Sequence, residues 1–228
     1  MIDELRGRVV RSRSALAVVE TMAVLSLVYR WVVRPWHQRW GATPDEVKDM
    51  MPGDELVPHP TLCATRGITI DARALDVWPW LVQMGGYTRA GWYSYDRFDN
   101  AGRASADRVI PELQDLRVGD VMLTSPTEGF VVRAIDPGRS LVLDLKHGGS
   151  RITSVPMLSP LPDGRTRLIL RISADLRPRH RLFGLAFDIG DFLFMRRQML
   201  GIRERIERQR AVRARSWSEH AHHARWTA

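Results

Sequence analysis

Hydrophobic and polar residues alternate along short segments in the middle of the chain. In residues 165–174, Leu168, Leu170 and Ile172 would point to one face of a strand and Arg171 to the other. Turn sequences such as Asp-Pro-Gly and Pro-Asp-Gly separate these segments. We therefore expect an antiparallel meander rather than a parallel sheet with interleaved helices. Its strands should cover residues 64–71, 121–124, 129–135, 140–146, 151–158 and 165–174.

A helical period replaces the alternation at the C-terminal end. Apolar residues recur there every three or four positions, at Leu185, Ile189, Phe192, Met195, Met199, Ile202 and Ile206. This stripe predicts a helix over about residues 180–211, and the concave face of the meander is the surface that could cover it. Two shorter helices are also expected. One begins at Pro44 with Thr43 as its cap, and the other covers residues 72–84 with Asp71 as its cap and Pro79 inside it.

The N-terminal segment contains a mostly apolar stretch, residues 15–33, which Glu20 and Arg30 interrupt. It could span a membrane, lie in the membrane interface, or pack on the protein itself. Together with the other patterns it divides the chain into four parts. These are a basic N-terminal helix that could be a membrane anchor (1–36), a proline-rich connector (37–61), an α+β domain (62–212) and a disordered tail (213–228).

The net charge of +8 changes the choice of partners. Arginines gather near the two ends of the chain and suggest an anionic partner. An acidic membrane surface accounts for them better than nucleic acid, because no nucleic-acid-reading motif is present. We expect a cytoplasmic protein that could attach to the inner face of the cell membrane. Cys63, the only cysteine, excludes an intramolecular disulfide and is expected to be buried.

Several local sequences resemble the START-like superfamily, which includes the SRPBCC and polyketide cyclase-type proteins. They are ITIDARALDVWPWLVQMG, GWYSYD, SADRVIPELQDLRVGDV and RTRLILRI, and they look most like uncharacterised bacterial members. The resemblance covers roughly residues 62–210. It implies a helix-grip fold, in which a curved antiparallel sheet wraps around a long C-terminal helix and encloses an apolar cavity. It does not select a function, because one fold hosts many functions.

Candidate site residues follow from this expected cavity. Aromatic residues give apolar contact area with a polar handle, and a few polar groups would orient a ligand. The candidates for ligand binding are Trp80, Gln83, Trp92, Tyr93, Tyr95, Asp96, Arg108, Arg171, Phe192 and Met195. No standard catalytic signature occurs, and we expect neither a cofactor nor a metal site.

Three functions remain open at this point. The first is binding, transport or sequestration of a hydrophobic small molecule or lipid near a membrane, through contact made by residues 15–33. The second is an enzyme of the cyclase or aromatase type, acting on a hydrophobic substrate in the same cavity. The third is a structural protein with a collapsed cavity. We favour binding, because no set of catalytic residues stands out in the sequence.

Overall fold

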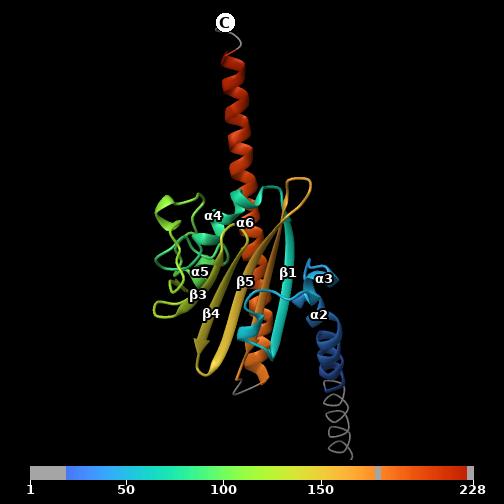
Figure 1. Ribbon diagram of the computed structural model, residues 1–228. Helices are drawn as coiled ribbons and strands as arrows, with labels where there is room; N and C mark the ends of the chain where they lie inside the picture. The colour runs from blue at the N-terminus through green and yellow to red at the C-terminus, as the bar shows by residue number, and fades with distance from the viewer. Residues whose placement is uncertain (1–18, 178–180, 225–228) are drawn as a thin grey trace, which may run out of the picture.

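The computed structural model describes residues 19–177 and 181–224 and confirms the helix-grip fold. Six antiparallel strands, ordered β1-β6-β5-β4-β3-β2, form an open sheet that curves around one long helix, α6 (Figure 1). The strands are β1 (Leu62–Ile70), β2 (Val121–Leu123), β3 (Gly129–Asp136), β4 (Ser140–His147), β5 (Ser150–Pro160) and β6 (Thr166–Asp175). Strands β2 to β6 pair with their neighbours in sequence, which is the predicted meander, and β1 pairs with β6.

The helical elements surround this sheet. Residues 19–28 are helical and continue into the π-helical turn η1 (Tyr29–Val33) and helix α2 (Arg34–Gln38). The other helical elements are α3 (Pro44–Lys48), η2 (Asp54–Leu56), α4 (Ala74–Val82), α5 (Asp96–Asp99), η3 (Pro111–Leu113) and α6 (Arg181–Ala224).

The two predicted helix caps had different outcomes. The Thr43 cap is confirmed, because its hydroxyl accepts from the Glu46 amide and the Glu46 carboxylate accepts from the Thr43 amide. The prediction that Asp71 caps α4 was wrong. The N-cap is Arg73 and carries no side-chain cap, while the Asp71 carboxylate pairs with Arg210 at 2.9 Å.

The main core lies between the concave face of the sheet and the middle of α6. Met199, Ile202 and Ile206 are buried against aliphatic residues of β1 and β6 and against Trp80 of α4. The void that remains between α6, α4 and the sheet is only about 10 Å³, about the smallest space that can hold one water molecule. The space between the middle of α6 and the sheet is therefore filled by side chains, and a binding site must lie to one side of this core.

The connector covers part of the convex face of the sheet. Met51 packs there on Val142, Val155 and Ile169. Cys63 also lies on the convex side, near the end of the edge strand β1, and it is exposed, so the prediction that it is buried was wrong.

Helix α6 is longer than the predicted helix and less completely covered. It continues past residue 211 to Ala224, so the predicted tail begins inside it. Its first turns contact the sheet on one side only, where Phe187 packs against the cluster of Leu62 and Ala174, and Leu185 and Ile189 stay about 40% exposed. The expectation that the sheet covers the whole stripe was wrong for this half. Within the described part of the chain, none of the helices combines the length and hydrophobicity that crossing a bilayer requires.

Candidate functional site

A pocket of about 190 Å³ lies on the side of α6 where strands β2 and β3 end the sheet. We call it the aromatic pocket. It is lined by Trp92, Ser94, Asp99, Thr124, Phe130, Ser154, Phe194, Met195 and Gln198. The loop before α5, α5 itself, the residue after β2, strands β3 and β5, and helix α6 thus all contribute to its walls.

The aromatic walls are held in fixed orientations. The Trp92 indole N–H donates to the Leu123 carbonyl oxygen at 2.9 Å, and its ring meets Phe130 edge to face at 6.1 Å between centroids. Phe194 meets Tyr95 in the same way at 5.3 Å. Buried aromatic side chains with satisfied polar ends form a rigid apolar surface, and such surfaces are typical of small-molecule sites.

The loop that carries Trp92 is itself anchored by polar contacts. Tyr93 has a positive φ of 59°, which is uncommon for a residue with a large side chain. Its amide donates to the Ser105 hydroxyl at 3.0 Å, and that hydroxyl donates to Asp96. Gly201 of α6 lets the Tyr93 carbonyl approach closely, because a Cβ at this position would clash with the oxygen. The backbone geometry beside the pocket therefore depends on a small residue in α6.

Asp99 is the only acidic or basic side chain that lines the pocket. Burial raises the pKa of Asp99 to about 6, and the negative charge of Asp96 adds to the shift. Backbone hydrogen bonds from Asp99 and Tyr95 act in the opposite direction. One carboxyl oxygen, Oδ1, is buried and has no hydrogen-bond partner among the described residues. Protonated, this carboxyl group can donate to an acceptor on a bound molecule, and such a shifted acid in a cleft marks a functional candidate.

The structure brings only some of the predicted residues to this pocket. Trp92 and Met195 line it. Tyr95 and Asp96 are not among its lining residues: Tyr95 packs on Phe194, and Asp96 accepts a hydrogen bond from Ser105. The other predicted residues lie in the core or on other surfaces.

Trp80, Gln83 and Tyr93 form a buried group in the core. The Gln83 amide donates to the Tyr93 hydroxyl at 2.8 Å and to the Arg108 carbonyl at 3.1 Å. The Tyr93 hydroxyl in turn donates to the Trp80 carbonyl at 3.3 Å. Burial raises the pKa of Tyr93, so this hydroxyl stays neutral. The Arg108 side chain is exposed, and only its carbonyl takes part. These contacts tie the loop to α4.

Arg171 and Phe192 lie on other surfaces. Arg171 is buried on the convex face, where it donates to the carbonyls of Glu46, Val47 and Asp49 and pairs with Asp54 at 2.7 Å. Phe192 lies under the N-terminal helix, with its ring against Trp36 and His37. Neither residue reaches the aromatic pocket.

Sequence reasoning missed seven of the nine lining residues. Phe194 and Gln198 lie one helical turn apart beside Met195, so extending the apolar stripe sideways would have included them. Ser154 is a small polar residue at an inward position of a strand, which leaves room for a ligand. Asp99 lies in the aromatic loop that the sequence singled out, but nothing in its local sequence distinguishes it from Asp96.

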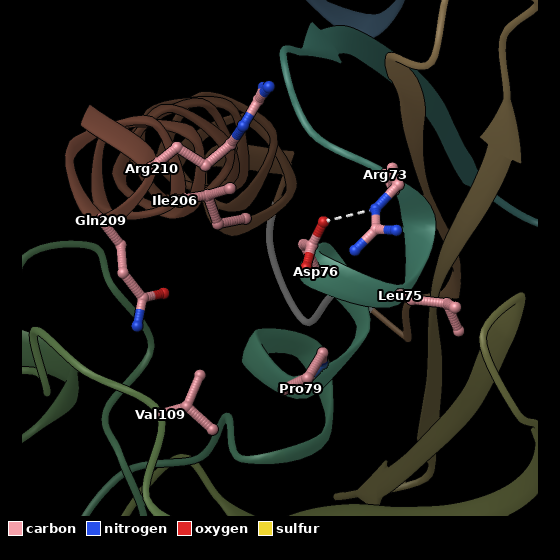
Figure 2. A pocket seen from close by; sticks show the side chains of 8 residues that line it. All are labelled: Arg73, Leu75, Asp76, Pro79, Val109, Ile206, Gln209 and Arg210. Atoms are coloured by element: carbon pink, nitrogen blue, oxygen red, sulfur yellow. Dashed lines mark hydrogen bonds and ion pairs between the residues drawn. The ribbon is translucent and has the colours of Figure 1, made fainter. Parts of the chain in front are cut away.

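A larger cleft of about 470 Å³ lies where α6 passes α4 (Figure 2). Its charged groups already have partners: Arg73 pairs with Asp76 at 3.0 Å, and Arg210 pairs with Asp71 at 2.9 Å. Arg73 is mostly exposed to water, so its charge is strongly screened. The cleft contains none of the predicted site residues, and its water-exposed charges make it a weaker candidate than the aromatic pocket.

No protein-family model matches the chain, and a search of curated proteins finds no significant similarity. Solved structures give low-identity similarities. A protein from Thermobifida fusca is 15% identical over 64% of this chain and 93% of its own, with a TM-score of 0.44. CalU16 from Micromonospora echinospora is 18% identical over 65% and 86%, with a TM-score of 0.35. DynU16, from the dynemicin biosynthetic locus, is 15% identical over 61% and 46%, with a TM-score of 0.37. All three TM-scores are below 0.5, so these similarities carry no information about function.

Proposed function

We propose that this protein binds a small hydrophobic molecule in the aromatic pocket and that Asp99 recognises a polar group on it. One observation carries the proposal. A pocket with rigid aromatic walls contains a single carboxyl group whose buried Oδ1 has no partner among the described residues. Leaving a buried polar atom unpaired costs about 1–3 kcal/mol, and a ligand that pairs with it recovers part of this cost.

The volume of the pocket limits the size of the ligand. An apolar cavity of about 150 Å³ accepts benzene, whereas drug-sized ligands occupy about 300–1,000 Å³. At about 190 Å³ the aromatic pocket suits one ring with a short substituent, or one end of a longer molecule. A fused multi-ring substrate would need the loop before α5 to move.

The chemistry of Asp99 indicates which polar group the ligand carries. The Ser94 hydroxyl already donates to the Phe194 carbonyl at 3.0 Å, so it is less available to a ligand. Below about pH 6 the Asp99 carboxyl group is protonated and acts as a donor. At that pH the matching ligand is an apolar molecule with a hydrogen-bond acceptor, such as an aromatic ketone, whereas the carboxylate present above about pH 6 would accept a hydrogen bond from an aromatic alcohol.

Catalysis in the same pocket is the alternative. A pKa of about 6 suits a general acid or base near neutral pH. However, Asp99 is the only acidic or basic group among the lining residues, and acid–base reactions commonly use a second group. We therefore favour binding, and product formation from a bound ketone would support the enzyme.

The test is a calorimetric titration of the full-length protein at pH 5, where Asp99 is protonated, with acetophenone and with ethylbenzene, which lacks the carbonyl acceptor. Ser154→Met should fill the pocket from β5 and weaken acetophenone binding by about tenfold or more, through overlap with the ligand. Ser159→Met, on the outward face of the same strand, is the matched control and should bind like the native protein. Equal binding by both variants, or no acetophenone binding at millimolar concentration, would overturn the proposal.

A further inference from the structure

The N-terminal helical segment exposes an unusual amount of apolar surface. Figure 1 shows this segment extending away from the sheet, beside the β1 edge. Between residues 19 and 36, ten large hydrophobic side chains are exposed, and Trp31 reaches 71%. They are Val19, Met22, Val24, Leu25, Leu27, Val28, Trp31, Val32, Val33 and Trp36.

These side chains point in all directions around the helix. Successive residues in a helix are about 100° apart, and Val24 and Leu25 are both exposed, as are Trp31, Val32 and Val33. A second protein surface covers one side of a helix. A helix that is apolar all round calls for an environment that surrounds it, which lipid provides.

Helix α6 extends this apolar surface. Leu185, Ile189 and Leu193 are exposed at four-residue steps along the first half of α6, and Asp188 in the same stretch contacts Arg34 of the N-terminal helix. Leu25 and Leu185 line the same groove, of about 690 Å³, which runs between the two helices. The exposed stripe of α6 and the N-terminal segment thus form one surface, which we call the apolar end.

A buried polar network fixes the N-terminal helix to the body. The Asp188 carboxylate accepts from Arg34 at 2.7 Å, from Gln38 at 3.1 Å and from the Tyr29 hydroxyl at 3.2 Å. Arg66 of β1 donates to the His37 carbonyl at 2.9 Å. Because these contacts hold residues 29–38 against β1 and α6, the exposed part of the helix is presented in a defined orientation.

The charge near the apolar end is positive. Because Arg34 is paired with Asp188, the charges left in the described residues 19–39 are Arg30 and Arg39 against the single acid Glu20. The Arg30 guanidinium lies 6.0 Å from the centre of the Trp31 ring. Paired tryptophan and arginine residues beside an apolar helix are typical of segments at the interface of an anionic bilayer.

We propose that the apolar end binds an anionic lipid bilayer, with the exposed apolar side chains of residues 19–33 inserted and Arg30 and Arg39 at the headgroups. This inference does not depend on the aromatic pocket, which is formed by other residues. The occupant is the bilayer rather than a second copy of the chain, because lipid accounts for both the all-round exposure and the positive charge.

The test is flotation of the full-length protein with vesicles of phosphatidylcholine, alone or mixed with phosphatidylglycerol. Native protein should float with the anionic vesicles, less with the neutral ones, and less as salt is raised. The triple variant Leu25→Gln, Leu27→Gln, Trp31→Ser should lower the partition coefficient by about tenfold or more. A matched variant, Met50→Gln, Leu75→Gln, Val118→Gln, changes exposed apolar residues outside the apolar end and should float like the native protein.

Three results would overturn the inference. The first is native protein that stays unbound with both kinds of vesicle. The second is equal flotation of the two triple variants. The third is a native protein that does not bind vesicles and is a dimer by light scattering, while the Leu25, Leu27 and Trp31 variant is a monomer. That result would assign the apolar end to self-association. Equal circular dichroism spectra of the two variants exclude loss of folding as the cause.

Discussion

Replacing Asp99 by asparagine should make the protein more stable at pH 8 and leave its stability almost unchanged at pH 4. The reason is that folding places this carboxyl group among apolar side chains and near Asp96, which raises its pKa from 3.8 to about 6. Ionised Asp99 therefore destabilises the folded state relative to the unfolded state. Asparagine has nearly the same shape and no charge.

The direction in which stability changes with pH follows from the number of protons that each state binds. Between the unfolded pKa of 3.8 and the folded value of about 6, the folded state holds more protons than the unfolded state, so stability falls as pH rises. A shift of about 2 pKa units corresponds to at most about 3 kcal/mol. Asp99 is only half-buried, and water screens part of this cost, so we expect a gain of about 1–1.5 kcal/mol for Asp99→Asn above pH 7.

Urea denaturation at a series of pH values, followed by circular dichroism, measures this difference directly. Asp107→Asn makes the same change at an exposed position and serves as a control, and it should alter the free energy of unfolding by no more than about 0.5 kcal/mol. The reasoning fails if Asp99→Asn is no more stable than the native protein at pH 8, or if its advantage is the same at pH 4.

Three further predictions concern residues outside the pocket walls. Asp144→Asn should show the opposite pH dependence. Burial raises the pKa of Asp144, but Arg151 and Arg133 outweigh burial, so the pKa is lowered overall. The native protein should therefore be more stable than the variant above about pH 4, and urea denaturation should show this difference shrinking as the pH falls. Arg66→Met should cost about 3–5 kcal/mol in the same assay, because it leaves Asp191 buried without its partner at 2.7 Å, and Arg66→Met with Asp191→Leu should recover most of the loss. Gly201→Ala should cost about 1–3 kcal/mol and also weaken acetophenone binding in calorimetry, since the new methyl group displaces Tyr93 and the loop that carries Trp92. A Gly201→Ala protein with native stability would contradict the close approach seen here.

The strands could be predicted because alternation and turn chemistry are local properties. In β6, Leu168, Leu170 and Ile172 face inward as expected, since each residue of an antiparallel strand points opposite to its neighbour. The helix-grip order followed from the sequence of elements and from the resemblance together. Local rules failed where a residue distant in the sequence determines the contact of a side chain. Asp71, for example, pairs with Arg210 instead of capping α4.

Buried charges were harder to assign than buried aliphatic residues. Arg66 occupies an inward position of β1, between Ala64 and Ile68, where the pattern calls for an apolar side chain. It is tolerated there because Asp191 pairs with it across the interface with α6. Arg171 is buried on the outward face because the connector supplies four oxygen acceptors. In both cases the partners are more than a hundred residues away in the sequence, so the local sequence around the arginine does not reveal that it is buried.

The pocket position could not be predicted either, because it depends on how side chains fill space. Sequence placed the cavity at the centre of the grip, but Met199, Ile202 and Leu170 fill that centre and leave about 10 Å³. Space remains toward β2 and β3, where the short Ser154 faces Phe194 and Gln198 across the pocket. One residue of different size at any of these positions would move or close the pocket without changing the strand pattern.

Helix α6 links the two proposed sites, and its periodicity explains how. Phe194 and Gln198 face the aromatic pocket, Met199 and Ile202 fill the core, and Leu185 belongs to the apolar end. These directions differ around the helix axis, so the helix needs a wider apolar surface than its contact with the sheet alone requires. The same helix contributes Asp188 and Asp191, which fix the N-terminal helix and β1. The proposed pocket for a hydrophobic molecule and the proposed surface for lipid therefore both use side chains of the same helix.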